Sequence, residues 1–375
     1  MAPVPKIPTE MKTPPLVLMI LIALPMSGAV LAQSTSYSPP AGYFLLTIGG
    51  AMDNHLSIPL VRPTASFFKV ASADKTILTA RSGKWTRGAF RCADANQSRV
   101  YHAEFCSGAL KGVRYRVLDN SEDTLFLDTQ GDDLTAHRLG GVGFDDVVRL
   151  RESWRVGAVF GATDQEVLLG SRPDALTPGD SVILPDNASI GQNKPPSTEL
   201  FFVAGHGWRS TAGSDRDEQL CPLEPGAPFV VRRLSSQDTS MAVIGQVPTG
   251  AQSIHVVGGN GANGNDSHVS LLFPEPVSLG NSGLSDLGNP AASVIQSSRN
   301  RLLRGDELLA YGPRSGFDPA PEHSFFYLEN TGWREVGSDS STVSADFILQ
   351  PGTAYVIRKK LGHPGVDWLQ PPADR

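Results

Sequence analysis

The chain has 375 residues, enough for two ordinary domains, and a formal net charge of −6. An acidic chain without a basic stripe argues against nucleic acids and anionic membrane surfaces as partners. Its 38 Gly and 29 Pro, with few helix-favouring runs, predict an all-β protein of short strands and many turns.

Residues 1–32 have the features of a signal peptide. Lys6 and Lys12 precede an apolar stretch at 16–24, and small residues then lead to Ala32. We therefore expect cleavage after Ala32 and export to the periplasm or the extracellular space. The alternative is an uncleaved anchor, but this apolar stretch is too short to span a bilayer, which takes about 20 residues. A polar leader follows at 33–41, and we expect no transmembrane segment after it.

Three cysteines follow the signal segment. Cys92 and Cys106 flank a turn-rich stretch and a strand, so an oxidising compartment favours a disulfide between them. Cys221 would then be left over, and we expect it to be buried. No cysteine spacing resembles a zinc site.

A block of motifs occurs twice, with its parts 124 to 126 residues apart. Each copy contains, in the same order, Gly-Asp, Phe-Phe, Gly-Trp-Arg, Gly-Ser-Asp and a Pro-Gly pair before a strand that ends in two cations. The copies span 179–233 and 305–359. A weaker repeat precedes them, a strand pair at 43–61 and another at 253–273. This order predicts two similar units, each a small sandwich or barrel.

The first unit carries an insertion. Gly49 and Trp208 are 159 residues apart, whereas the corresponding Gly258 and Trp333 are 75 apart, so the first unit has about 84 extra residues. We predict a first unit at 42–244 with an inserted β subdomain at about 65–170, a second unit at 245–361, and a tail at 362–375. Within the insertion, residues 113–118 alternate as a strand does, with Arg114 and Arg116 on one face.

The repeated Trp208 and Trp333, with the adjacent Arg209 and Arg334, are candidate binding residues. An exposed aromatic ring there would stack on a sugar. The alternative is a core tryptophan covered by its arginine, which presence in both copies favours. His206 has no counterpart in the second copy and is the most specific polar candidate for binding.

Two other features suggest ligands. The loop at 258–267 is rich in Gly, Asn and Asp, and Asn263, Asn265 and Asp266 are the best candidates for a metal site, which would bind calcium as a cofactor. The alternative is a hairpin loop with an insertion. The paired cations after each Pro-Gly turn either bind an anion or keep an edge strand soluble, and we favour the second interpretation.

Several of these motifs in fixed order resemble a known family. Ser107-Gly-Ala-Leu-Lys-Gly112, Gly207-Trp208-Arg209 and Pro225-Gly226 are similar to the motifs of an uncharacterised exported protein family found as paralogues in Verrucomicrobia and relatives. The resemblance implies export and no assigned activity. Some relatives end in a sorting signal with a membrane segment and a basic tail, and the end of this chain at 370–375 has neither.

The functional prediction is an exported, non-enzymatic β protein, a structural or binding component of the cell envelope or extracellular matrix. Its expected partner is a glycan or an envelope protein. The alternative is a carbohydrate-active or other hydrolytic enzyme, which the sequence supports less, because it contains neither Gly-x-Ser-x-Gly nor His-Glu-x-x-His.

Overall fold

The computed structural model describes residues 40–94, 98–140, 145–213, 216–285, 293–312, 316–338, 343–370 and 372. The predicted signal segment and most of the leader lie outside these residues, as do the acidic ends of both Gly-Ser-Asp motifs. Pro39–Arg375 form one compact unit. The prediction of an all-β fold is confirmed, since the one α-helix of the described residues, α1, spans only Val156–Phe160. No helix in the described ranges has the length and apolar composition needed to cross a membrane.

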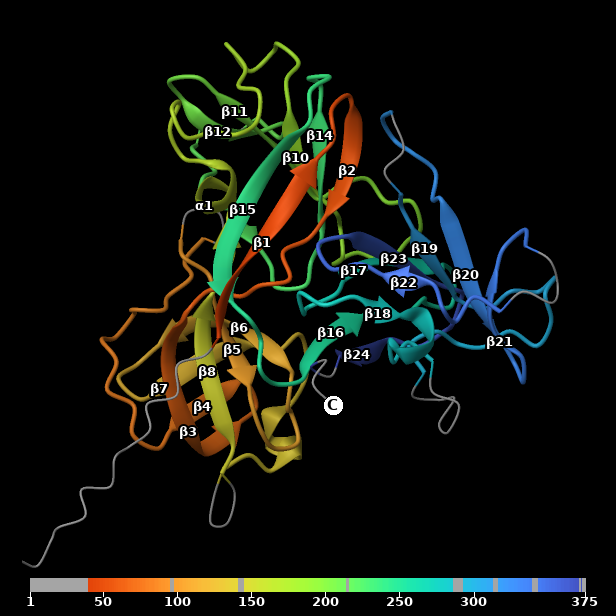
Figure 1. The fold of residues 1–375 in the computed structure, drawn as a ribbon. Helices are drawn as coiled ribbons and strands as arrows, with labels where there is room; N and C mark the ends of the chain where they lie inside the picture. Colours follow the sequence, from red (N-terminus) through yellow and green to blue (C-terminus); the bar gives the residue numbers. More distant parts are fainter. Residues whose placement is uncertain are drawn as a thin grey trace, which may run out of the picture. The chain divides into compact units, whose positions relative to one another are not determined.

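The first repeat contains a five-stranded antiparallel sheet and two ribbons of two strands each (Figure 1). The sheet has the order β12-β11-β10-β14-β2, and the ribbons are β1–β15 and β9–β13. The bounds are β1 Ala41–Ile48, β2 Met52–Leu56, β9 Trp154–Arg155, β10 Ser181–Leu184, β11 Thr198–Val203, β12 Gly207–Ser210, β13 Pro222–Leu223, β14 Phe229–Arg233 and β15 Thr239–Gln246.

The second repeat has the same topology. Its sheet has the order β21-β20-β19-β23-β17, and its ribbons are β16–β24 and β18–β22. The bounds are β16 Gln252–Val256, β17 Asn265–Ser270, β18 Val277–Ser278, β19 Glu307–Ala310, β20 His323–Leu328, β21 Gly332–Glu335, β22 Ile348–Leu349, β23 Ala354–Lys359 and β24 Val366–Gln370; a 3-10 turn, η2, covers Leu279–Asn281. In each repeat the longer ribbon packs on its sheet around a separate apolar core.

The extra residues of the first half form a closed six-stranded barrel between β2 and β9, in the order β3-β4-β7-β6-β5-β8 (Figure 1). Its strands are β3 Thr64–Asp74, β4 Ile77–Ala80, β5 Tyr101–Phe105, β6 Arg114–Asn120, β7 Thr124–Asp128 and β8 Val147–Glu152, with a 3-10 turn, η1, at Leu134–His137. The barrel has its own core, in which the alternating Tyr115 and Val117 point inward.

Two boundaries differ from the sequence-based ones. The barrel ends at Glu152 rather than near 170, because Trp154, Phe160 and Leu169 pack in the core of the first repeat. The predicted tail contains β24, which pairs with β16 and buries Trp368 in the second core. Strand 366–370 was missed because its partner lies more than a hundred residues earlier in the chain.

The Ser-Gly-x-x-x-Gly motif at 107–112 forms hydrogen bonds within the barrel and between the barrel and the second repeat. Ser107 Oγ donates to Asp145 O at 3.0 Å and accepts from Val147 N at 2.9 Å. A Cβ on Gly108 would lie 1.7 Å from the Asp146 carboxylate, so only glycine fits there. Gly112 O accepts from Ser253 N at 3.0 Å and thereby joins the barrel to β16.

The paired cations at the end of β14 and β23 are neutralised inside the protein, so neither sequence-based interpretation of them holds. In each repeat the first cation pairs with an aspartate on the neighbouring edge strand, and the second with the buried aspartate of the Gly-Asp motif. The four pairs are Arg232–Asp53 at 2.8 Å, Arg233–Asp180 at 3.0 Å, Arg358–Asp266 at 2.8 Å and Lys359–Asp306 at 3.0 Å.

The two repeats exchange equivalent contacts. Asp53 N, on the edge strand of the first repeat, donates to Gly316 O of the second at 3.0 Å, and Asp266 N donates to Gly191 O at 2.9 Å. Two residues after each of these glycines lies a residue with φ of +50°, Asn193 after Gly191 and Asp318 after Gly316. Asn193 bonds to Asp266 and Arg358 of the second repeat, and Asp318 bonds to Asp53 and Arg232 of the first. The duplication has therefore produced an internal pseudo-dimer.

The Pro-Gly turns lie at the same interface. A Cβ on Gly226 would lie 2.6 Å from Leu272, and one on Gly352 would lie 2.4 Å from the ring of Phe44. Both glycines have φ of +77°, a conformation that L side chains rarely adopt. Glycine is therefore required in these turns for two reasons, the positive φ of the backbone and the lack of space for a Cβ beside the neighbouring repeat.

Replacing Gly352 by Ala is expected to destabilise the fold more than the same change at Gly362. Gly362 has φ of +73°, and a Cβ added there would meet no described atom within 4 Å. Gly362→Ala should therefore cost only about 1 kcal/mol of backbone strain. Gly352→Ala adds a clash with Phe44, which should cost about 1–2 kcal/mol more. Urea unfolding of both variants measures the difference. Equal losses of unfolding free energy in the two variants would mean that Phe44 can move away from a Cβ at position 352.

Candidate functional site

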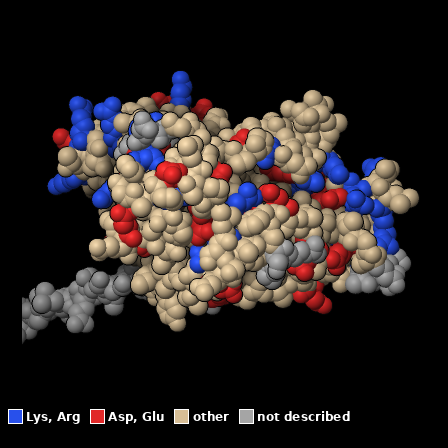
Figure 2. Space-filling model, turned by 90° about the horizontal axis from the view of Figure 1, so that it is seen from above, with Lys and Arg blue, Asp and Glu red and all other residues tan. Residues whose placement is uncertain are grey.

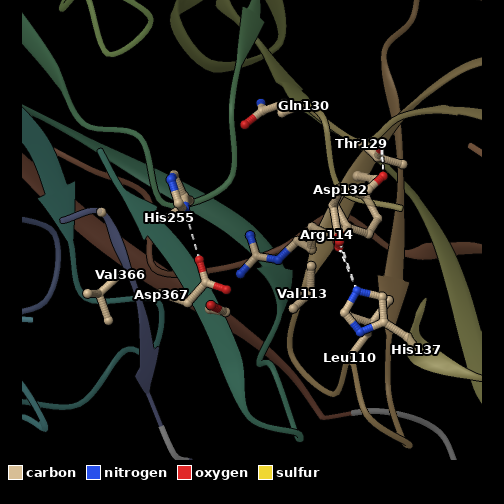
Figure 3. Close-up of a pocket in the computed structure, with 13 residues that line it drawn as sticks. Leu110, Val113, Arg114, Thr129, Gln130, Asp132, His137, His255, Val366 and Asp367 are labelled. Carbon is tan, nitrogen blue, oxygen red and sulfur yellow. Dashed lines mark hydrogen bonds and ion pairs between the residues drawn. The ribbon is translucent and has the colours of Figure 1, made fainter. Parts of the chain in front are cut away.

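A polar cleft lies between the barrel and the β16–β24 ribbon (Figure 3). Its volume is about 420 Å³. The barrel provides residues of β6, of the loop after β7 and of η1, and the second repeat provides residues of β16 and β24. The polar residues of its lining are Arg114, Tyr115, Thr129, Gln130, Asp132, His137, Ser253, His255 and Asp367.

On the barrel side, Asp132 is held by three neighbours. Tyr115 donates its hydroxyl to Asp132 Oδ2, His137 Nε2 lies 2.9 Å from Oδ1, and Thr129 Oγ1 donates to the backbone carbonyl of Asp132 at 2.6 Å. Burial and then the hydrogen bond to Asp132 raise the pKa of Tyr115. Although burial opposes it, the bonds from Tyr115 and His137 lower the pKa of Asp132. This wall therefore presents a fixed carboxylate beside an imidazole.

On the opposite side, His255 and Asp367 form a cross-strand pair. They are directly opposite in the β16–β24 register, and Nδ1 of His255 lies 2.7 Å from Oδ1 of Asp367. This hydrogen bond raises the pKa of His255 above its ordinary value, although burial opposes the shift. Nε2 points toward Gly365, where a Cβ would lie 3.4 Å away. A larger residue at 365 would crowd this nitrogen in the cleft.

Two further pockets, of about 250 and 580 Å³, continue the cleft toward the first repeat. The first shares Arg114, Gln130, Ser253 and His255 with the cleft of Figure 3, and Gln130 lines all three. Gln130 is exposed and has φ of +54°, a left-handed conformation that is uncommon for residues other than glycine. Strained backbone of this kind is enriched at functional sites.

The 250 Å³ pocket, which lies between the other two and is called the middle pocket below, has a charged wall made by both the barrel and the first repeat. Glu224 accepts from His102 Nε2 at 2.7 Å and from Arg116 at 2.8 Å. Burial alone would raise the pKa of Glu224, but these two partners lower it to about 2. The other ring nitrogen of His102 lies 2.9 Å from Ser153 Oγ, which gives a Ser–His–Glu chain. Ser153 is only 1% exposed, so its hydroxyl cannot reach a substrate.

Trp208 and Trp333 are not binding platforms, which corrects the sequence-based candidates. They are 0% and 3% exposed, and each packs edge-on against an aromatic ring of its own core. Arg209 and Arg334 each donate to the carbonyl of the preceding tryptophan at 3.0 Å. These residues occur in both copies of the motif because each repeat has to fill an equivalent core.

His206 is exposed in the turn between β11 and β12, and it lines none of the three pockets of the cleft. Its backbone N–H donates to Val203 O at 3.0 Å and closes the turn. The residue that differs most clearly between the two copies is therefore a turn residue away from the cleft.

The predicted calcium ligands do not converge. Asn265 and Asp266 are adjacent in β17, so their side chains point to opposite faces. Asn265 bonds to Val257 O, Ser267 and Gly191 N, and Asp266 pairs with Arg358. The backbone of Asn263 closes a turn with Asn260. No group of three or more His, Cys, Asp or Glu side chains within the described ranges is arranged to hold a metal ion.

The predicted disulfide is not formed, since Cys92, Cys106 and Cys221 are all free thiols. Burial raises the pKa of Cys106 to about 11, and its sulfur lies 3.6 Å from Glu104 O. Cys221 is buried in the first core as expected. Sequence spacing alone could not place Cys92, which lies in an irregular segment between β4 and β5.

Charges of both signs are intermingled on the face seen in Figure 2, with broad uncharged areas between them. A scan against protein-family models and searches of curated proteins and of solved structures found no match to this chain. The site must therefore be interpreted from its own geometry.

Proposed function

We propose that this is an exported, non-enzymatic binding protein of the cell envelope or extracellular matrix, and that it binds a glycan chain in the cleft between the barrel and the second repeat. The observation that carries the proposal is the row of three adjoining pockets joined at Gln130, two of which are lined mainly by polar residues. Export rests on the N-terminal segment, and the family resemblance is in keeping with it.

The lining suits hydroxyl groups. Three carboxylates of the cleft are fixed beside a donor: Asp132 beside His137, Asp367 beside His255, and Glu224 beside His102 and Arg116. Such pairs offer acceptors and donors to a ligand without reorganisation.

One observation favours a hydrolase as the second candidate. Two carboxylates, Asp132 and Asp367, line the same pocket, and the His255 Nε2 beside Gly365 is available to move a proton. A hydrolase would release reducing ends from the glycans that it binds, and Asp367→Asn would abolish that release. Binding without release supports the first candidate.

The test is a glycan panel on residues 33–375, followed by calorimetry with the best oligosaccharide. Gln130→Ala is expected to weaken binding about five- to tenfold, since it removes one hydrogen-bonding amide. Asn330→Ala is the matched control, because Asn330 also has a left-handed φ of +61° but lies in the β20–β21 turn, outside all three pockets. Equal affinities for wild type and Gln130→Ala would remove the cleft from the proposal.

A further inference from the structure

Beneath the cleft, a buried chain of polar groups carries more positive than negative charge. Arg151 Nε donates to Glu104 Oε2 at 2.7 Å, and Gln252 Nε2 donates to Glu104 Oε1 at 2.7 Å. Arg114 Nη2 donates to Gln252 Oε1 at 2.6 Å. Two guanidinium groups thus share one carboxylate, and the neutral amide of Gln252 separates Arg114 from it.

Arg114 is the end of this chain that reaches the cleft. It lines the pocket of Figure 3 and the adjoining middle pocket, and the figure shows its guanidinium between His255–Asp367 and the Asp132 cluster. Among the described residues it pairs with no carboxylate within 4.0 Å, and its buried Nε has no hydrogen-bond partner. The nearby Arg116, by contrast, is neutralised by Glu224.

The other carboxylates of the pocket do not compensate Arg114. Asp132 is bonded to Tyr115 and His137, and Asp367 is bonded to His255. Glu104, opposite Arg114 in the β5–β6 register, and Glu224 attract its charge from a distance but form no ion pair with it. A half-buried cation without a direct ion pair is costly, and a ligand carboxylate would supply that pair. Ser253 and His255 line the same two pockets as Arg114 and add donors beside it.

We propose that the cleft selects an acidic glycan and that Arg114 binds the carboxylate of a uronic acid unit. This inference rests on the proposed glycan-binding function. Arginine is suited to the role, because its planar, permanently charged group matches the geometry of a carboxylate. The remaining sugar hydroxyls would contact Gln130 and the paired groups of the adjoining pockets.

The experiment compares oligogalacturonate with its methyl ester, which has the same backbone without the charge. Calorimetry on residues 33–375 should give at least about tenfold tighter binding of the acid form. Arg114→Gln should remove that difference, whereas Arg114→Lys should retain part of it. Arg149→Gln is the matched control, since Arg149 lies on barrel strand β8 and lines none of the three pockets. Thermal melting of each variant verifies folding.

The outcomes separate the two proposals. If Arg114→Gln binds the acid form as tightly as wild type, Arg114 is not the anchor and the inference fails. If acid and ester bind equally and Gln130→Ala weakens both, glycan binding survives without the acidic preference. If neither binds, both proposals fail for this class of sugar. Inorganic phosphate forms a separate arm, and displacement of the acid by millimolar phosphate would show a general anion site instead of carboxylate selectivity.

Discussion

Asp306→Asn is expected to lower the free energy of unfolding by about 3–5 kcal/mol, because it leaves a buried ammonium without its counterion. Lys359 and Asp306 are both 0% exposed and pair at 3.0 Å. Asp306 also accepts from Gln296 N, from Lys360 N and from His363. The substitution keeps the shape of the side chain and removes its charge, and urea unfolding measures the loss.

The first repeat offers a matched control. Asp180 holds Arg233 in the equivalent place, but the Arg233 side chain is 10% exposed, against 0% for Lys359, and it also donates to Gln237 O at 2.7 Å. Asp180→Asn should therefore cost less than Asp306→Asn. Adding Lys359→Met to Asp306→Asn should restore much of the stability, since both charges are then absent. A loss below about 1 kcal/mol for Asp306→Asn would show that Lys359 is solvated.

Acidification from pH 7.5 to 4.5 is expected to destabilise the protein through two equivalent histidines, His55 on β2 and His268 on β17. His55 stacks on Tyr311 at 4.1 Å, and neither of its ring nitrogens has a hydrogen-bond partner among the described residues. Burial lowers the pKa of His55 to about 4. Burial also lowers the pKa of His268 to about 4, and repulsion from His55 adds to the effect.

The direction follows from proton binding. Each histidine has a lower pKa folded than its ordinary 6.5, so the unfolded chain binds more protons between pH 6.5 and 4. Stability is therefore complete above pH 6.5 and falls as the pH drops toward 4, by about 2–3 kcal/mol per histidine at pH 4.5. His255 contributes with the opposite sign, because its pKa is raised.

His55→Phe isolates this effect, since phenylalanine keeps the stacking on Tyr311 and cannot titrate. Urea unfolding at pH 7.5 and 4.5 should show a loss for His55→Phe that is about 2–3 kcal/mol smaller than for wild type. His206→Phe, at an exposed turn, should lose as much as wild type. The same pH dependence in His55→Phe and wild type would mean that His55 is hydrated in the folded protein.

Local patterns in the sequence predict much of the fold. The spacing of Gly-Asp, Gly-Trp-Arg and Pro-Gly identified the duplication, because both copies must form the same turns and fill the same core. Comparing the distances between equivalent motifs also located the insertion, because two repeats of the same topology should have similar spacings and the first has extra residues between its motifs. The end of the insertion was set too late because Trp154 and Phe160 belong to a core whose other members lie far along the chain.

The cleft could not be predicted, because its walls come from segments that only the packed fold brings together. Alternation placed Arg114 and Arg116 on one face of β6, but nothing in the sequence indicates that β16 lies opposite Arg114. His255 and Asp367 pair across two strands that are separated by most of the second repeat. Trp208 and His206 attracted attention because they are rare residues in a marked motif, and neither one lines the cleft.

Hydrogen–deuterium exchange with the best-binding oligosaccharide tests the central claim most directly. If the cleft is the binding site, saturation should slow exchange in the loop after β7 around Gln130, in β16 near His255, in β24 near Asp367 and around Glu224 in the adjoining pockets, and leave the rest of the protein unchanged. Protection elsewhere, for example on the exposed face of the β1–β15 ribbon, or no protection at saturating ligand, would contradict the account.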